Sequence, residues 1–553
     1  MNKDSLPSPH ILDWISLSLF TLFITAQPFY LQHEIIMMDT GIHLPALNAL
    51  LRGLIPYKDF IFWRGPLELY IPGIMMKIFG AQTFLLPTFF IIGSVLTLIV
   101  AAFLAFQIYR TRLMFYLFIP VLVARTFPRV SYYYWGGLRY FIGLLALVCA
   151  LQAFKKRRPG FFLAAGVISA LSLLTTIEAG SAAILAIGAG IVVSGVFKIE
   201  NRSFILRCLG NYFLSLGLIL GIYILYLLKT GSLNAYLDIT LGVPKTLIVL
   251  MDTRGNYPGN FWSFIYALIP GTKFFKFMTP FYGHLIIWGY LVYRLRKGNL
   301  NWEIPVLAMI SIYGLILFFA SFRAIEGHHF EMALQPEKIL LFFLFERGYL
   351  FVKNNLNWKV YALRLLIMVF ILSSLGYAFG RYNHRFTALK LLRYSLFHQD
   401  KKIDELKPLY GEPVKELTID RLKFMTVPLW QAEEIEGVVK FIQEHTIPTE
   451  PIFCYPEVGN FAFWADRPLV GRFSVGTFAW VQDKWQRELV EDFKKARPKY
   501  VIMTHVGHKT FPAAIYFRWP ENIRKFKEVT ELILNNYTPV KSFESVAIYE
   551  RKI

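Results

Sequence analysis

About eleven apolar runs, each close to the length needed to cross a bilayer, follow one another between residues 11 and 379. A helix needs roughly 20 such residues to span the hydrocarbon core, because each residue advances it by about 1.5 Å. The backbone of a lipid-exposed segment must satisfy its own hydrogen bonds, which a helix does. The runs cover residues 11–30, 84–108, 113–127, 138–154, 160–176, 180–197, 205–228, 281–294, 304–322, 337–352 and 360–379. The sequence therefore predicts a polytopic α-helical membrane protein.

Composition and charge agree with this interpretation. Of the 553 residues, 55% are hydrophobic and only 17% are charged, which is too apolar for a soluble globular protein. The formal net charge is +21, but the basic residues form short clusters between apolar runs, and this argues against nucleic-acid binding. Cys149, Cys208 and Cys454 lie far apart and suggest neither a disulfide framework nor a metal site. The first run has no clear signal-peptide cleavage site, so we expect it to be retained as a helix.

The basic clusters also predict an orientation. Short cytoplasmic loops are enriched in Lys and Arg, and with a cytoplasmic N-terminus every expected inner loop is basic: 110–112, 155–158, 198–207, 294–297 and 353–359. The expected outer segments are 31–83, 128–137, the turn at Glu178, 229–280 and 323–336. We therefore expect a multi-pass protein of the plasma (inner) membrane, with a transmembrane domain over 1–380. Its long first outer loop (31–83) shares the extracytoplasmic side with a domain over 381–553.

The segment 381–553 has mixed charge with amphipathic and alternating stretches, which is typical of a soluble α/β domain. We expect helices over 432–445 and 488–497, strands over 451–455 and 500–503, and a closing hairpin over 539–550. The segment has no Gly-rich phosphate loop, GxSxG elbow, HExxH or paired CxxC, which favours a binding or supporting role. In the first outer loop, residues 67–79 read as a further half-buried or interfacial helix.

The first outer loop carries the most informative residues. Asp39 follows the first apolar run by about nine residues and is succeeded by Thr40, Gly41 and an amphipathic stretch suited to the membrane interface. A carboxylate near the membrane is costly unless it is paired or functional. Asp39 is therefore the first candidate for chemistry, with an interfacial cap or an ion pair as the structural alternative.

This loop resembles the first outer loop of the GT-C glycosyltransferases. The resemblance rests on Asp39-x-Gly41, Leu51-Arg52-Gly53, Pro56-Tyr57-Lys58-Asp59-Phe60 and Gly65-Pro66-Leu67. Within that superfamily it is most similar to the bacterial branch related to protein O-mannosyltransferases and to the lipid A aminoarabinose transferase. Thr40 stands where many relatives have a second acidic residue, which weakens a two-carboxylate metal site and leaves a divalent cation as an open question.

The resemblance implies an inverting membrane glycosyltransferase that moves a hexose or pentose from a polyprenyl-phosphate donor to a lipid, protein or glycan acceptor at the outer face. Asp39 would be the general base for the acceptor hydroxyl. The departing lipid phosphate needs cations nearby. The supply near the outer surface is Arg64, Arg129, Arg139, Lys245, Arg254 and Arg323, and the segment with His328 and His329 resembles one that faces the carrier phosphate in related transferases.

Each of these residues also has a structural alternative. Asp59 is a further candidate for substrate binding, or it caps a turn or pairs with Lys58; Glu178 contacts the sugar or acceptor, or forms a structural pair. A single basic residue at this depth often contacts a lipid head group. Adjacent His residues do not share a helix face, so His328 and His329 are poor candidates for a two-His metal site.

Two other classes of protein compete with a transferase. A transporter or flippase of a lipid-linked sugar would also have many helices, but it should show pseudo-repeated halves and broken helices, and we find no such symmetry. A receptor or assembly subunit would use the membrane part only as an anchor, for which eleven helices are more than is needed.

Overall fold

A computed structural model describes residues 10–25, 35–126, 136–250, 261–272, 275–321, 333–353, 364–373, 414–508, 517 and 519–552. The chain forms two compact units. The first comprises residues 1–28, 89–221 and 256–399, and the second comprises 29–88, 222–255 and 400–553. The first loop and the C-terminal segment therefore belong to one unit, although most of the helical part of the chain separates them in sequence.

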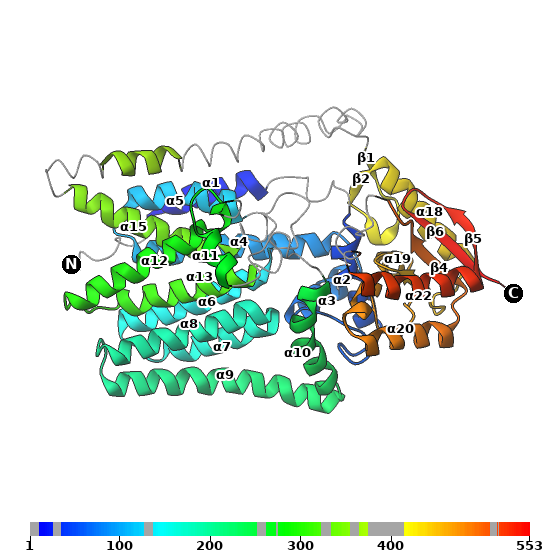
Figure 1. Ribbon diagram of the computed structural model, residues 1–553, viewed down its shortest axis with the longest axis horizontal. Helices are drawn as coiled ribbons and strands as arrows, with labels where there is room; N and C mark the ends of the chain where they lie inside the picture. The colour runs from blue at the N-terminus through cyan, green and yellow to red at the C-terminus, as the bar shows by residue number, and fades with distance from the viewer. Residues whose placement is uncertain are drawn as a thin grey trace. The chain divides into compact units, whose positions relative to one another are not determined.

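The first unit is a bundle of apolar helices (Figure 1). Each of the eleven predicted runs contains a helix: α1 (Ile11–Thr25), α4 (Leu85–Ile108), α5 (Arg112–Thr126), α6 (Leu138–Lys156), α7 (Phe161–Thr175), α8 (Ile177–Val196), α9 (Arg202–Thr230), α12 (Phe275–Arg296), α13 (Glu303–Ser321), α15 (Gln335–Lys353) and the helical residues Arg364–Ser373. Among the described residues, α4, α6, α8, α9 and α13 are long and apolar enough to cross a membrane, and shorter apolar helices lie in α1, α5, α7 and Arg364–Ser373.

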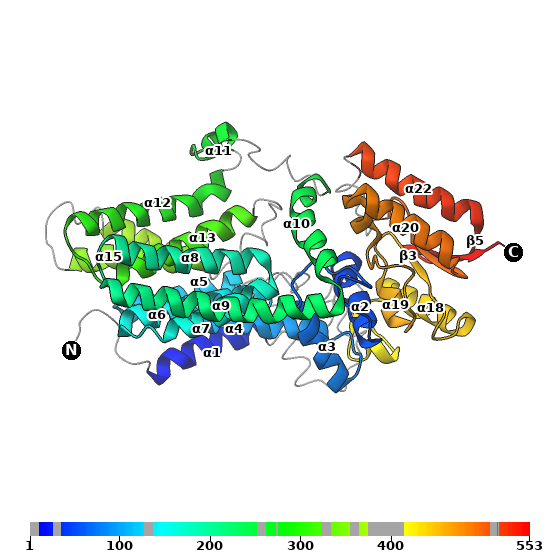
Figure 2. The same ribbon diagram turned by 90° about the horizontal axis from the view of Figure 1, so that it is seen from below.

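Small residues let these helices approach one another closely. Helix α8 packs against both α13 and α7, and α6 packs against α7, as the two views of the bundle show (Figures 1 and 2). A Cβ at Gly166 would lie 2.3 Å from the Tyr212 carbonyl oxygen of α9, and a Cβ at Gly180 would lie 2.2 Å from Leu173 Cα. Such contacts replace the hydrophobic effect as the source of helix association in lipid.

The segment 229–280, expected to be an outer loop, is more ordered than predicted. It contains α10 (Leu233–Leu250) and α11 (Phe261–Ala267), and α12 begins at Phe275 instead of residue 281. Helix α10 has polar and apolar residues interleaved, so a search for continuous apolar runs does not find it.

The second unit contains a four-stranded sheet in the order β3-β4-β6-β5. Strand β3 (Phe453–Tyr455) is parallel to β4 (Tyr500–Thr504), whereas β6 (Val546–Arg551) runs antiparallel to both β4 and β5 (Tyr537–Ser542). The neighbouring helices are α18 (Leu429–His445), α20 (Asp483–Ala496) and α22 (Pro520–Asn536). The predicted helices, strands and hairpin of this segment are confirmed, whereas α22 and the small sheet of β1 (Val414–Glu416) and β2 (Thr426–Pro428) were missed.

Two helices of the first loop complete this unit. Helix α3 (Leu67–Phe79) has the bounds predicted from the sequence, and α2 (Met37–Leu51) carries Asp39 in its first turn. Helix α2 packs on the short helix α19 (Asn460–Trp464). Ten of the fifteen residues of α2 are buried, which a surface amphipathic helix would not show.

Candidate functional site

The C-terminal segment holds the turn that carries Asp39. The Asp39 side chain is 8% exposed, and α2 has no capping side chain of its own at its start. The amide of Asn460 donates from Nδ2 to the Met37 carbonyl (3.0 Å) and to Thr40 Oγ1 (2.8 Å). Gln431 Oε1 accepts the Ile35 N–H at 2.7 Å, and its Nε2 donates to the Ile35 carbonyl at 3.0 Å. Asn460 and Gln431, both more than 390 residues away, thus fix this turn.

A polar cluster lies one helical turn beyond Asp39. His43 is buried, with Nδ1 3.3 Å from the Asp39 carbonyl oxygen and Nε2 4.0 Å from Glu68 Oε2. Arg64 Nη1 donates to the same Glu68 oxygen at 3.0 Å. Burial lowers the pKa of His43 from its ordinary value, although the nearby Glu68 carboxylate opposes this shift. His43 is therefore neutral at pH 7, and the Arg64–Glu68 pair balances its own charge.

Asp59 closes a tight turn in the first loop. Its Oδ2 accepts the Ile55 N–H at 2.8 Å, and its own N–H donates to the Ile55 carbonyl at 2.9 Å. Tyr57, inside this turn, has a φ of +68°, a conformation that a bulky residue adopts only when its surroundings enforce it. This geometry favours the structural alternative for Asp59.

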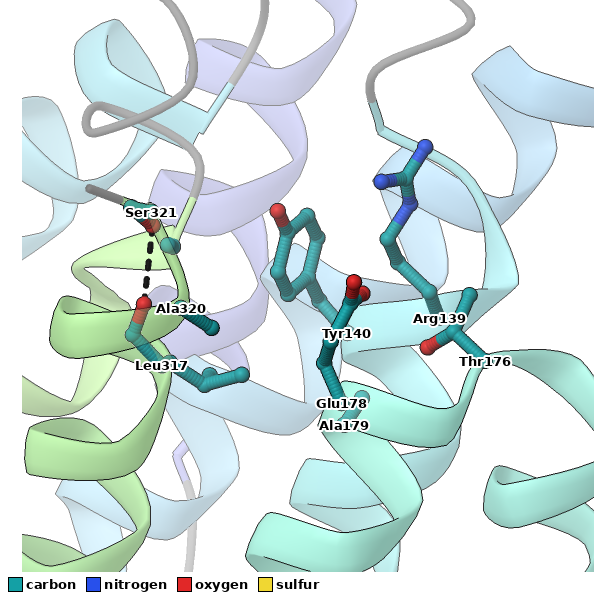
Figure 3. Close-up of a pocket in the computed structure, with 9 residues that line it drawn as sticks. Arg139, Tyr140, Thr176, Glu178, Ala179, Leu317, Ala320 and Ser321 are labelled. Atoms are coloured by element: carbon teal, nitrogen blue, oxygen red, sulfur yellow. Dashed lines mark hydrogen bonds between the residues drawn. The ribbon is translucent and has the colours of Figure 1, made fainter. Parts of the chain in front are cut away.

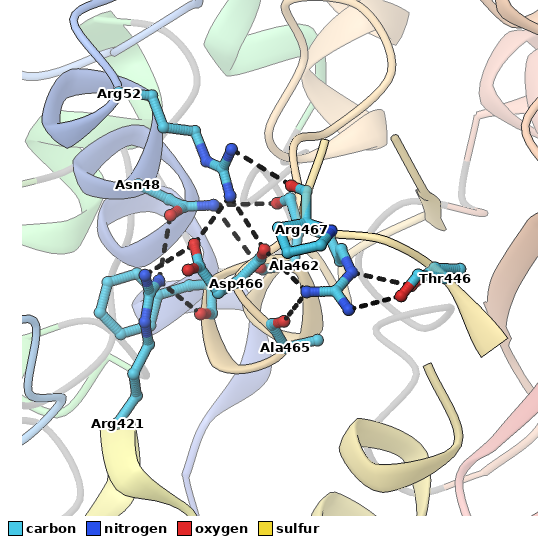
Figure 4. A network of polar contacts seen from close by, with 10 residues as sticks. Asn48, Arg52, Arg421, Thr446, Ala462, Ala465, Asp466 and Arg467 are labelled. Atoms are coloured by element: carbon cyan, nitrogen blue, oxygen red, sulfur yellow. Dashed lines mark hydrogen bonds and ion pairs between the residues drawn. The ribbon is translucent and has the colours of Figure 1, made fainter. Parts of the chain in front are cut away.

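The other end of α2 is fixed by a second network with the C-terminal segment (Figure 4). Arg52 and Arg421 both reach Asp466 Oδ1, each at 2.7 Å. Asn48 donates from Nδ2 to the Arg467 carbonyl at 2.9 Å, and its Oδ1 accepts from Arg421 Nη1 at 3.0 Å. Both ends of α2 are thus tied to residues of the C-terminal segment.

A separate polar cavity lies in the helical bundle, at the ends of α6, α8 and α13 (Figure 3). It encloses about 380 Å³, part of it open to solvent, and its lining includes Arg139, Tyr140, Thr176 and Glu178. Arg139 is buried, donates from Nε to the Gly136 carbonyl at 3.2 Å, and lies 5.6 Å from the Tyr140 ring centre. The structure therefore brings together two of the predicted site residues, Arg139 and Glu178.

The remaining predicted residues lie outside the described part of the chain. These are Arg129, Arg254, Arg323, His328 and His329, while Lys245 lies in α10 but its side chain is not described. Among the described residues, no group of three or more His, Cys, Asp or Glu side chains is arranged to hold a metal ion.

Comparison with known proteins identifies the fold. No protein-family model and no curated protein sequence matches this chain. Among solved structures, the crystal structure of ArnT from Cupriavidus metallidurans bound to undecaprenyl phosphate superposes with a TM-score of 0.50 at 12% identity, covering 98% of this chain and 97% of that one. The chain has the GT-C fold.

Two further solved structures have lower TM-scores with this chain of GT-C fold. ArnT from the same organism in the apo state has a TM-score of 0.48, 14% identity, and covers 98% and 97% of the two chains. The Archaeoglobus fulgidus oligosaccharyltransferase tethered to an acceptor peptide has a TM-score of 0.45, 12% identity, and covers 98% of this chain and 74% of that one. The predicted class, a polytopic helical membrane protein of the GT-C type with a C-terminal α/β segment, is confirmed.

Several residues near Asp39 could have been found from the sequence, and others could not. His43 and Glu68 were not singled out, although His43 follows Asp39 on one face of α2 and Glu68 follows Arg64 by the same four residues. Gln431 and Asn460 had no such local signal, because their partners are about 400 residues away.

Proposed function

We propose that this chain is an integral membrane glycosyltransferase that moves a sugar from a polyprenyl-phosphate donor to an acceptor at the outer face of the membrane. The GT-C fold over nearly the whole chain supports this proposal, as does the undecaprenyl phosphate bound to ArnT. The observation that carries it is the burial of Asp39 in the first turn of α2, a turn that Gln431 and Asn460 hold through its neighbouring residues. A site that must place a base accurately needs such support.

In the proposed reaction, Asp39 takes the proton of the acceptor hydroxyl as its oxygen forms a bond to the anomeric carbon. The bond between that carbon and the phosphate oxygen breaks on the opposite side, so the configuration inverts. The electron pair leaves with the lipid phosphate, whose negative charge must be stabilised by cations. Arg64 and Arg139 are the described candidates, and Arg129, Lys245, Arg254, Arg323, His328, His329 and a divalent cation remain proposals for the same role.

The orientation is part of the proposal. The N-terminus would be cytoplasmic, and the C-terminal segment would lie outside the plasma (inner) membrane together with the first loop. The membership of both segments in one compact unit supports a shared compartment for them. Glu178, beside Arg139 in the bundle cavity, is proposed to contact the sugar or the acceptor.

The test is transfer of a labelled sugar from a panel of polyprenyl-phosphate donors by the purified protein in lipid. Asp39→Asn should lower turnover by about 10²- to 10⁴-fold, the contribution of a general base, while donor binding is retained. The matched control is Asp420→Asn, because the Asp420 carboxylate is 88% exposed and pairs only locally with Lys423.

Two outcomes would contradict the proposal. Full turnover by Asp39→Asn would remove Asp39 from catalysis. A wild-type protein that binds donor but neither transfers nor hydrolyses it would instead support a transporter or flippase of a lipid-linked sugar.

A further inference from the structure

Basic side chains converge on one buried carboxylate at one end of the helical bundle. Glu303, at the start of α13, is 2% exposed and accepts hydrogen bonds from three arginines. Arg110 Nη2 and Arg347 Nη2 reach its Oε1 at 2.9 and 3.1 Å, and Arg294 Nη1 reaches its Oε2 at 3.1 Å. These arginines come from the α4–α5 connection, from α15 and from the last turn of α12, so three separate parts of the bundle meet here.

The charges of this cluster do not cancel. Glu346 adds a second buried carboxylate, whose Oε1 accepts from the backbone of Arg110 and Thr111 at 2.8 and 2.7 Å. Lys155 adds a fourth cation: its Nζ lies 5.2 Å from the ring centre of Trp302, the residue before Glu303. Four cations against two carboxylates leave an excess of at least two positive charges (4 − 2 = 2).

The cluster also has hydrogen-bond donors to spare. Within the part of the chain that the structure describes, Nε and Nη1 of Arg347 and Nε of Arg294 are buried without an acceptor. Buried N–H groups are nearly always paired, and an unpaired one is costly. The side chains of Arg110, Arg294 and Arg347 are 27%, 14% and 14% exposed, so the cluster borders the surface of the bundle. A planar fork with free N–H groups fits the oxygens of a phosphate.

The cluster lies at the opposite end of the same helices from the cavity of Arg139 and Glu178. On α13, Glu303 begins the helix and Ser321, which lines the cavity, ends it. A separation of 18 residues (321 − 303) corresponds to about 27 Å along a helix, close to the thickness of the hydrocarbon core. The cluster therefore belongs to the other face of the membrane from the cavity.

We propose that Arg110, Arg294, Arg347 and Lys155 form a binding site for a phosphate group, contributed by an anionic phospholipid head group of that leaflet. Juxtamembrane basic residues attract anionic lipids, and here the excess charge is combined with unpaired guanidinium donors in a fixed arrangement. The site would help to hold α12, α13 and α15 together at the face of the membrane away from the proposed transfer reaction. The proposed phosphate site does not depend on that reaction.

The experiment compares purified protein in nanodiscs of phosphatidylcholine alone with nanodiscs that also contain phosphatidylglycerol, and a third arm adds inorganic phosphate to the phosphatidylcholine discs. Thermal stability and lipid retained after detergent extraction, measured by native mass spectrometry, are the readouts. We expect phosphatidylglycerol to raise the stability of the wild type and to be retained. Arg347→Gln should weaken retention by about fivefold or more, as loss of one basic contact predicts.

Glu303 keeps two arginine partners in Arg347→Gln, so the bundle is expected to fold. Arg347→Lys keeps the charge but loses the planar fork, so its lipid retention should lie between those of the wild type and Arg347→Gln. Arg296→Gln removes the same charge from an exposed position on α12 and should retain lipid as the wild type does. If inorganic phosphate stabilised the wild type as much as phosphatidylglycerol does, the site would bind a free anion, and the assignment to a lipid head group would be overturned. Equal lipid retention by the wild type and Arg347→Gln, or equal losses in Arg347→Gln and Arg296→Gln, would overturn the proposal.

Discussion

His43 illustrates how burial determines the charge of a single residue near the proposed base. The ring is enclosed on one side by Phe62, whose centre lies 5.5 Å away in an edge-on arrangement, and Glu68 lies beyond Nε2. Desolvation disfavours the imidazolium, so the pKa of His43 is lowered. A neutral ring can position Asp39 and Glu68 without adding a positive charge that would weaken the base.

This shift predicts a pH dependence of stability. The unfolded chain binds a proton at His43 more readily than the folded chain does. Protonation therefore favours unfolding: the stability of the folded chain is full above about pH 6.5 and falls as the pH drops below that value. Between pH 7.5 and 5.5 the wild type should lose more thermal stability than His43→Gln, which has no group to titrate there. His10→Gln, at an exposed position, should behave as the wild type, and identical pH profiles for all three proteins would contradict this prediction.

Two substitutions of Asp59 can distinguish its structural role from a role in substrate binding. Asp59→Asn keeps an oxygen that can accept the Ile55 N–H, whereas Asp59→Ala does not. We expect Asp59→Ala to lose about 1 kcal/mol of stability, as for other lost caps, and Asp59→Asn to lose little, with kcat/KM nearly unchanged in Asp59→Asn. A large fall of kcat/KM in a stable Asp59→Asn protein would assign Asp59 to substrate binding instead.

At the scale of elements, the close approach of α2 to the C-terminal segment depends on Gly459. A Cβ there would lie 2.3 Å from the Ser474 carbonyl oxygen and 3.0 Å from Pro45 Cγ of α2. Gly459→Ala should therefore loosen the contact, raise hydrogen exchange across Met37–Leu51 and lower transfer activity. Gly188→Ala, where a Cβ meets nothing within 4 Å, is the matched control; unchanged exchange in Gly459→Ala would show that the contact tolerates the methyl group.

Some elements could be predicted from the sequence for a simple physical reason. A long apolar run needs no partner to be recognised, because lipid itself imposes the helix on it. The amphipathic helix α22 carried a usable signal that was missed, a proline at its start followed by a helical period. The burial of α2 could not be predicted, since its polar partners Asn460 and Gln431 are remote and their amides look like ordinary surface residues.

In the candidate site too, some residues could be predicted from the sequence, whereas their arrangement could not. Asp39 could be proposed from its short motif and its depth, and Arg139 and Glu178 from their position at helix ends. That the latter two line one cavity depends on how α6, α8 and α13 pack, which no local pattern records. The network of Arg52, Arg421 and Asp466 likewise appears only when distant segments are folded together.

For the whole molecule, the proposed orientation predicts which positions are accessible from outside the cell. A cysteine introduced at Lys440, which is 77% exposed on α18, should react with a membrane-impermeant maleimide on intact cells. A cysteine at Lys297, exposed between α12 and α13, should react only after the membrane is permeabilised. The natural cysteines Cys208 and Cys454 are buried and Cys149 is partly buried, so background labelling should be low. The reversed pattern would place the Asp39 loop in the cytoplasm.

The union of α2 with the C-terminal segment has a consequence for biosynthesis. Ile35 must wait for Gln431, 396 residues later, before its backbone groups are paired. At a synthesis rate of about 5 to 20 residues per second, this interval is on the order of 20 to 80 s. In the proposed orientation the nascent first loop would be translocated during that time without its final partners, and its buried polar groups would need water or a chaperone. A chain that is released before residue 431 can still insert its helices, but its Asp39 turn lacks the partners Gln431 and Asn460.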